Sequence, residues 1–511
     1  MSLHSRFIQN VSANWVTLAI NAFVGIYMVP LLIHHLGMTA YGVWVLLMQT
    51  VMIALVFSRG LQLSINRFVA FHRDRPDDYN RFINSALVLA GAFSLVIVVG
   101  TIGLAAGLTS LFETIPDELA PQAHLTCLLA GLTIVAMMFE ASFNEILNGF
   151  FHHARANVVL SLTALIRLTA MIVVLRSVSN IVVVQAVYLG SFTLSALGMA
   201  IVLKITVRAV RLGPRYIDGP AMRELFHYAA HSFTSQGLPI FLDSAMIILL
   251  GRFGEARHVA IFEIARKIPF FMRRFIISVL AVFMPLISTF HARREMARLK
   301  NLIVRGTRLG AALMLGLSLW VVTLAPTILD LWLGQNVAPG TVQVLRLMVL
   351  ATVPIGLFEL WVMLLIGMGY LRGVTVASLT AVALTLGLEI LLLHQPWPTN
   401  PAMAPAIALG VALWLKNVGW LPLYGLRRID GLALGVGKYF RAGLGRPLLA
   451  VVVAAAPVLI VVRVGSNAAW PPLVLILTTA GLIAMVFVPL ALGEEARLVW
   501  AGVARRISRA G

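Results

Sequence analysis

The sequence predicts an all-α polytopic membrane protein with about fourteen transmembrane helices. Of its 511 residues, 60% are hydrophobic and only 12% are charged, and the mean hydropathy is +0.93. Apolar runs long enough to cross the hydrocarbon core of a bilayer recur along the whole chain. The formal net charge of +19 is therefore explained by basic loops on one side of a membrane, and no nucleic-acid partner is expected.

Each predicted span is an apolar run bounded by charged residues or by Pro and Gly. The first run is too long for the core of a signal peptide and lacks a small-residue cleavage site, so it is interpreted as the first span. The second and eighth runs are longer than a bilayer requires, which indicates tilt or extension beyond the membrane. In chain order the spans are predicted near 12–34, 41–68, 83–108, 121–148, 157–175, 181–203, 228–250, 258–290, 309–329, 341–366, 374–394, 402–426, 447–463 and 471–492.

The loops between these spans predict the orientation of the chain. On the side of the N-terminus lie 27 of the 39 Lys and Arg residues, and four lie on the other side. By the positive-inside rule, both termini are predicted to be cytoplasmic. The loops on the outer side are short, and the longest, "TSLFETIPDELAP", has no basic residue. They leave no room for a folded catalytic domain, so we expect no enzymatic activity.

Cysteine usage restricts the chemistry further. Cys127 is the single cysteine, which excludes an intramolecular disulfide and a cysteine-based metal cluster. Neither a cofactor nor a metal is expected.

An internal repeat divides the chain. "RANVVLSLTAL" at 155–165 matches "RGVTVASLTAV" at 372–382 at six of eleven positions, an offset of 217. The same offset pairs "LGMTAYGVW" with "FGEARHVAI" and places Gly37 on Gly254. Each repeat would hold six spans, which relates the halves by an axis along the membrane normal. The predicted domains are 1–210 and 211–426, each a six-helix bundle, followed by 427–511 with a basic linker, two extra helices and a cytoplasmic tail.

The stretch "RKIPFFMRRF", residues 266–275, puts four cations inside an apolar segment. A charged residue at the centre of a membrane helix costs about 2.5–3.5 kcal/mol on insertion scales. At about 100° per residue, the charged residues of this helix fall within an arc of about 120°. The helix therefore has one wet wall, on which Glu263 can pair with Arg266 or Lys267 at helical spacing.

The first two helices of each repeat also carry polar stripes. These are Asn14, Thr17 and Asn21 in the first span, Arg59, Gln62 and Asn66 beside Arg67 in the second, and Ser232, Gln236 and Asp243 in the seventh. Polar stripes on equivalent helices of both halves are what a substrate cavity between repeats requires. The first-span residues could equally bond neighbouring helices, Arg67 could reach the cytoplasmic surface, and Asp243 could be an ordinary partner of an arginine.

Cations exceed acids among these residues, so the predicted cavity is positive and attracts an anion, with phosphate or diphosphate the natural candidate. The predicted substrate-binding residues are Arg59, Arg266, Lys267, Arg273, Arg274, Asn21, Asn66 and Gln236.

Four segments carry a resemblance to a known family: "VPLLIHHLGMTAYGVWVLL", "SRGLQLSINRFVA", "LDSAMIILLGRFGEARHVAIFEIARKI" and "PTILDLWLG". With them, nearly the whole chain resembles the polysaccharide-transport branch of the multidrug/oligosaccharidyl-lipid/polysaccharide flippase superfamily, as in O-antigen flippases. The resemblance implies two six-helix bundles forming a V around a central cationic cavity. It also implies alternating access that moves an undecaprenyl-diphosphate-linked oligosaccharide, an O-antigen or exopolysaccharide repeat unit, across the bacterial inner membrane.

The resemblance further implies an H⁺ or Na⁺ counter-ion, for which Asp243 and Glu263 are the coupling candidates. Membrane lipid is an expected partner, and polysaccharide polymerase or assembly proteins are compatible with this interpretation.

Three alternatives remain at this point. A lipid II-type peptidoglycan precursor flippase is disfavoured because the first span lacks the arginine-bearing pattern of that group. A cation-coupled multidrug exporter would need acids where this chain has arginines. A membrane glycan polymerase would need a sizeable outer loop, which the sequence lacks.

Overall fold

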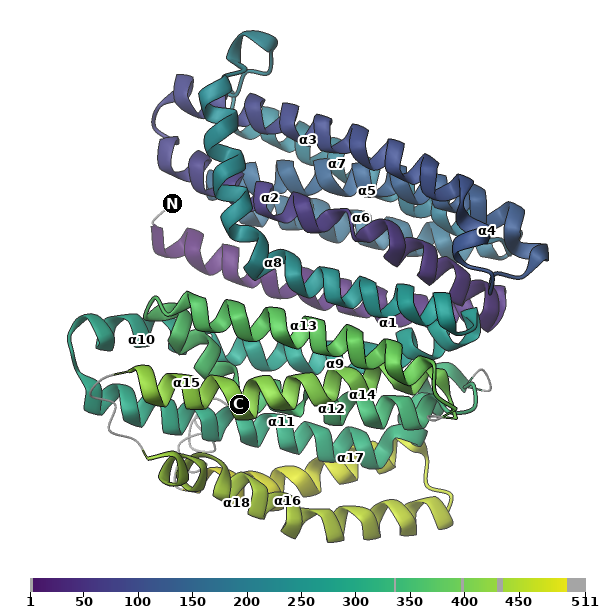
Figure 1. Ribbon diagram of the computed structural model, residues 1–511, viewed down its shortest axis with the longest axis vertical. Coiled ribbons are helices and arrows are strands. Elements are labelled where there is room, and N and C mark those ends of the chain that lie inside the picture. The colour runs from purple at the N-terminus through teal and green to yellow at the C-terminus, as the bar shows by residue number, and fades with distance from the viewer. Residues whose placement is uncertain (1–2, 335–336, 397–398, 430–434, 494–511) are drawn as a thin grey trace. The chain divides into compact units, whose positions relative to one another are not determined.

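The computed structural model describes residues 3–334, 337–396, 399–429 and 435–493, without the side chains of 3–15, 57 and 230–236. Every regular element among these residues is a helix, which confirms the predicted all-α class. The chain forms two compact units, Met1–Ala260 and Ile261–Gly511, and Figure 1 shows their helices coloured by residue number. The domain boundaries predicted at 210 and 426 were drawn from the sequence repeat, whereas these units are defined by compactness. The predicted boundaries therefore stay a prediction.

Unit 1 is built around α5, which packs against α1, α2, α3, α6 and α7. Small buried residues of α5 such as Ala130, Gly131 and Ser142 let its neighbours approach closely. The elements of this unit are α1 (Leu3–Met52), α2 (Leu55–His72), α3 (Pro76–Ala106), α4 (Leu108–Leu111), η1 (Asp117–Leu119), α5 (Ala120–Gly149), α6 (His153–Leu175), α7 (Ile181–Thr206), η2 (Pro214–Tyr216), α8 (Gly219–Phe253) and the first turn of α9 (Ala256–Leu280).

Unit 2 holds the rest of α9 and the following helices. Its core surrounds α12, where Phe358 and Trp361 have no exposed surface. The elements are α10 (Phe283–Ala292), α11 (Met296–Leu333), α12 (Thr341–Gly367), α13 (Leu371–Leu393), η4 (Pro401–Met403), α14 (Ala404–Trp414), the π-helix η5 (Leu415–Trp420), α15 (Leu421–Arg428), α16 (Val436–Asn467), α17 (Pro472–Leu482), the π-helix η6 (Ile483–Phe487) and α18 (Val488–Leu492).

The two predicted C-terminal spans correspond to α16 and to the run α17–η6–α18. Both pack on α11, through a cluster that includes Ala312, Ala450, Val458 and Phe487. At the start of α16, the buried Tyr439 hydroxyl accepts a hydrogen bond from Trp361 Nε1 at 2.7 Å.

By length and composition, twelve helices of the described part could span a membrane. Two of the fourteen predicted spans have no helix of their own among these twelve. The predicted span 41–68 is divided between the end of α1 and α2 by a turn at Ile53–Ala54. The predicted span 228–250 lies within α8, where several side chains are not described.

The internal repeat has a structural counterpart in the helix breaks. Gly37 interrupts α1 with φ +77° and ψ 167°, a backbone conformation that favours glycine. Its repeat partner Gly254 ends α8 in an extended conformation, with ψ −170°. Further along, α6 and α13 both have 23 residues and begin within one residue of equivalent positions.

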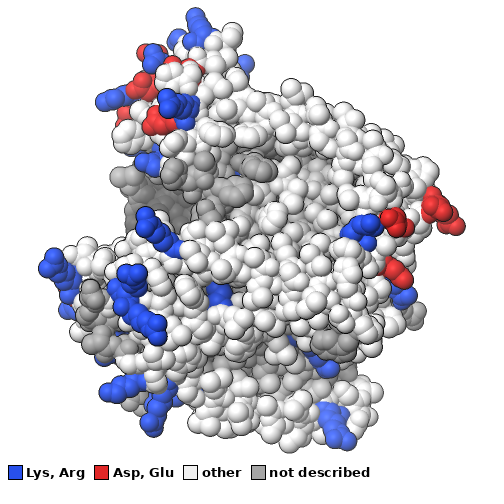
Figure 2. Space-filling view, viewed as in Figure 1, with Lys and Arg blue, Asp and Glu red and all other residues white. Residues whose placement is uncertain are grey.

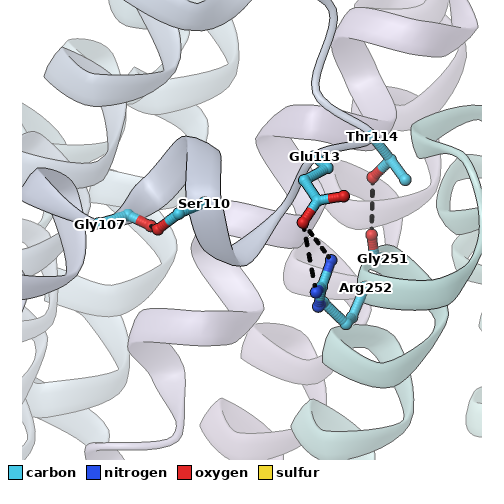
Figure 3. Close-up of polar contacts among 6 residues, drawn as sticks. All are labelled: Gly107, Ser110, Glu113, Thr114, Gly251 and Arg252. Carbon is cyan, nitrogen blue, oxygen red and sulfur yellow. Dashed lines mark hydrogen bonds and ion pairs between the residues drawn. The ribbon is translucent and has the colours of Figure 1, made fainter.

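Both ends of α8 are held within unit 1. The segment before α8 lies against α3, where Asn80 and Asn84 each accept a backbone N–H and donate to a backbone C=O of residues 209–213. At the other end, Glu113 forms an ion pair with Arg252 at 3.4 Å, and Thr114 Oγ1 donates to the Gly251 carbonyl at 2.7 Å (Figure 3). These contacts fix the helix that carries Asp243.

Charged side chains are distributed as a membrane-spanning protein requires. On the face shown in Figure 2, most of the basic side chains lie toward the left and right edges of the view, and the surface between them is nearly uncharged. The chain is therefore a multi-pass membrane protein, and its few charges inside helices call for an explanation.

Candidate functional site

The cationic face of α9 is organised around one buried acid. Glu263 is 3% exposed, and its carboxylate accepts from Arg266 Nε and from Lys267 Nζ. The spacing of three and four residues brings these side chains together on one helix face. Arg266 keeps 14% of its side-chain surface exposed and Lys267 keeps 33%, so both cations reach beyond the acid.

About two turns further along α9, the side chains of Arg273 and Arg274 point to different surroundings. Arg273 is half-buried and interacts electrostatically with Glu359 of α12 and Lys416 of η5. Arg274 is exposed and lies over the ring of Phe270, with Cζ 4.7 Å from the ring centroid. The opposite side of α9 is apolar as predicted, since Ile264, Met272 and Ile276 are buried.

Glu359 and Lys416 are among the charged residues within predicted spans to which the sequence assigns no role. Both lie inside predicted membrane spans, and a charge in such a place is the one sequence feature that could have marked them as functional. Nothing in the neighbouring sequence links them to α9. Lys416 belongs to a π-helical turn, an irregularity that is frequent at functional sites. With them, the charged set of unit 2 contains the five cations Arg266, Lys267, Arg273, Arg274 and Lys416 and the two acids Glu263 and Glu359, so it stays net positive.

In unit 1, α2 carries two of the predicted residues. Arg59 is exposed, and its Nη1 donates to Gln62 Oε1 at 2.9 Å. Asn66 donates to Glu145 Oε2 of α5 at 2.8 Å. Asn66 thus has a partner within the bundle, and Glu145 joins the polar set although the sequence gave it no role.

The polar stripe of the first span splits between two environments. Thr17 is buried, and its hydroxyl lies 2.9 Å from Ser161 Oγ and 3.2 Å from the Asn157 carbonyl of α6. Asn21 is exposed and donates to the Thr17 carbonyl at 2.9 Å. The side chain of Asn14 lies outside the described residues. This stripe therefore contributes both a helix–helix contact and an exposed amide.

On α8, the predicted residues are only partly described. The side chains of Ser232 and Gln236 lie outside the described residues. Asp243 is half-buried, and no ion pair joins it to another described side chain. Arg67 of α2 stacks on Tyr228 of α8, with Cζ 4.6 Å from the ring centroid. Arg67 therefore has an aromatic partner inside unit 1.

These sets are rich in guanidinium groups, which are suited to bind oxyanions. Guanidinium groups bind phosphate and carboxylate oxygens with two parallel hydrogen bonds. Within the described part of the chain, no group of three or more His, Cys, Asp or Glu residues is arranged to hold a metal ion. The arrangement offers charge and hydrogen-bond donors in a membrane setting.

Sequence comparison places the chain among known membrane proteins. The family described as "Polysaccharide biosynthesis protein" matches residues 7–291. The chain is also 23% identical over 493 residues to the "Uncharacterized membrane protein EpsK" of Bacillus subtilis (strain 168), with 92% of each chain covered.

Solved structures share the fold. An inward-facing multidrug resistance MATE family transporter of the MOP superfamily superimposes with a TM-score of 0.70 at 16% identity, covering 82% of this chain and 98% of that one. The lipid II flippase MurJ, in an inward closed conformation, gives a TM-score of 0.70 at 12% identity, covering 94% and 98%. A MOP superfamily transporter from Pyrococcus furiosus, whose structure is described as having a binding pocket of reverse polarity, gives 0.56 at 16% identity, covering 85% and 96%. At these identities the likeness establishes the fold.

Proposed function

The chain belongs to the polysaccharide biosynthesis protein family, and we propose that it translocates an undecaprenyl-diphosphate-linked oligosaccharide from the inner to the outer leaflet of the bacterial inner membrane. The observation that carries the proposal is the net positive charged set of unit 2. Its cations lie on helices that are otherwise apolar, and they outnumber their acids. An anionic head group balances this excess.

In the proposed cycle, the diphosphate binds to the cationic face of α9, formed by Arg266, Lys267, Arg273 and Arg274, with Arg59 as a further contact. The sugars occupy the hydrated interior of the cavity. The lipid tail stays in the bilayer, because its transfer to water would cost about 0.8 kcal/mol per CH₂. The two six-helix bundles, 1–210 and 211–426, then rock to expose the cavity on the other side. No covalent bond changes, so no catalytic residue is required.

The test is translocation in proteoliposomes of a fluorescent undecaprenyl-diphosphate oligosaccharide, with wild type compared to Arg266→Ala and Arg273→Ala. A hydrogen bond to a charged group contributes about 1.5–3 kcal/mol, so each variant should bind the substrate about 10- to 100-fold more weakly. Arg298→Ala is the matched control, because Arg298 is an exposed arginine of α11 that pairs with Glu295 at 2.8 Å. Retention of wild-type translocation by both folded variants would place the substrate elsewhere.

Parallel substrates separate the alternatives. Translocation of lipid II but not of the oligosaccharide would assign a peptidoglycan precursor. Export of a cationic dye that survives both arginine substitutions would assign a multidrug exporter, and formation of glycosidic bonds by the purified protein would assign a polymerase.

A further inference from the structure

A second acid of unit 2 is buried without a counter-charge. Glu389 lies in α13, and its side chain has no exposed surface. Neither carboxyl oxygen has a hydrogen-bond partner among the described residues. This environment is the opposite of that of Glu263, which is surrounded by two cations.

The elements packed against α13 do not supply a compensating charge. They are α12, α14, η5 and α15, and α14 contains no titratable residue. Besides Glu389, the titratable or charged residues on α12, η5, α15 and α13 are Arg346, Glu359, Lys416, Tyr424, Arg427, Arg428 and Arg372. Within the described part of the chain, no hydrogen bond or ion pair joins any of them to Glu389.

Three of these residues have partners elsewhere. Arg346 Nε donates to the Val322 carbonyl at 3.0 Å, and Glu359 and Lys416 interact with Arg273. The nearest hydroxyl along the helix, that of Thr385, donates to the Ala381 carbonyl. Glu389 therefore faces an apolar surrounding on every side that the structure describes.

Burial of an unpaired carboxylate in such a surrounding costs many kcal/mol, whereas a neutral carboxylic acid costs only what an imperfectly bonded polar group costs. Glu389 reaches its neutral form by binding one proton. No larger ligand is needed to make its burial tolerable.

We propose that Glu389 is a proton-binding site of unit 2, and that it is the group through which a transmembrane proton gradient acts on translocation. The second clause rests on the proposed function. In each cycle a carboxylate takes up one proton to become an acid, and it later releases that proton on the other side of the membrane. No electron transfer or covalent chemistry is involved.

The position of Glu389 suits this role better than those of the two candidates that the sequence suggested. It lies one turn, about 6 Å, before the end of α13 on the side predicted to face away from the cytoplasm. Arg266 and Lys267 keep Glu263 ionised through contacts that its protonation would break. Asp243 is half-buried, so it is less isolated from solvent than Glu389.

The first experiment is the infrared difference spectrum between wild type and Glu389→Gln at neutral pH, both reconstituted in lipid. We expect wild type to show one carbonyl stretching band of a protonated carboxylic acid that Glu389→Gln lacks. Glu389→Asp should shift this band, and Glu113→Gln, the control at an exposed ion pair, should leave it unchanged. Identical bands in wild type and Glu389→Gln would overturn the proposal.

A measurement on the unmodified protein removes any dependence on how the variant folds. The position of the same band is sensitive to hydrogen–deuterium exchange of the acid, and selective ¹³C labelling of glutamate carboxyls shifts it. A protonated-glutamate band in wild type supports the site, and a spectrum with only ionised glutamates contradicts it.

Coupling of translocation to the proton gradient is tested separately, by the ratio of the translocation rates with and without an acidic exterior. Wild type should give a ratio above one, Glu389→Gln a ratio of one, and Glu389→Asp a ratio between them. Equal ratios for wild type and Glu389→Gln would refute the coupling role. Failure of wild type to move the oligosaccharide would instead refute the proposed function, while the infrared band would still decide the proton site.

Discussion

Substitution of Glu263 by glutamine is expected to destabilise unit 2 by about 3 kcal/mol. Removal of one partner of a buried ion pair costs about 3–5 kcal/mol, because the remaining charge is left uncompensated. The lower end applies here, since Lys267 is 33% exposed and can extend toward a polar environment, whereas Arg266 is only 14% exposed. Thermal unfolding in detergent, followed by tryptophan fluorescence, measures the loss. At about 2–4 °C per kcal/mol for a unit of this size, the Tm should fall by about 6–12 °C.

The control is Glu295→Gln, which removes the acid of an exposed pair with the same spacing of three residues. Such pairs contribute at most about 1 kcal/mol, so its Tm should change little. Pyrophosphate should raise the Tm of Glu263→Gln more than that of wild type, because the released cations can then bind the added anion. Equal Tm values for wild type and Glu263→Gln would refute the claim that this acid holds the cationic face together.

Two further predictions concern packing and buried hydrogen bonds. In Gly60→Ala, the added Cβ would overlap the Ala229 carbonyl oxygen, so the contact between α2 and α8 should loosen at a cost of about 1–3 kcal/mol. Gly91→Ala, whose added Cβ would have nothing within 4 Å, should keep the wild-type Tm. Tyr439→Phe leaves the buried Trp361 Nε1–H without its acceptor, and a loss of about 1–3 kcal/mol should appear as a lower Tm, whereas an unchanged Tm would mean that the indole finds another acceptor.

The helices were predictable because each is a local apolar run, but their interruptions were not. The break at Gly37 follows from the repeat and from the conformational freedom of glycine. The turn at Ile53–Ala54 has no such local signal, since it is made of ordinary helix-compatible residues. The π-helix Leu415–Trp420 contains Gly419, but glycines such as Gly25 also lie inside regular helices of this chain, so a glycine alone does not predict the irregularity. Which turn of a long helix deviates depends on the side chains packed against it, and these come from distant parts of the chain.

The same distinction applies to the charged residues. The pairing of Glu263 with Arg266 and Lys267 was predicted from spacing alone, and the structure has these contacts. The interaction of Arg273 with Glu359 and Lys416 joins three helices. Their sequence positions give only the fact that each is a charge inside a span, so their proximity needed the fold.

Glu263 and Glu389, the two acids that the described part of unit 2 shows as buried, differ because of the residues one turn away. Glu263 has Arg266 and Lys267 at the third and fourth following positions, whereas Glu389 has Leu392 and Leu393 there. A change of charge on Glu263 would leave two cations unpaired, so this acid is suited to keep one charge throughout a transport cycle. Ionisation of Glu389 breaks no ion pair. It is costly only because the buried carboxylate is not hydrated, and this cost is removed when water reaches the carboxyl group. Access of water to the end of α13 is therefore the event that would couple proton release to a change of conformation, and the acid that lacks a partner is the one that can respond to it.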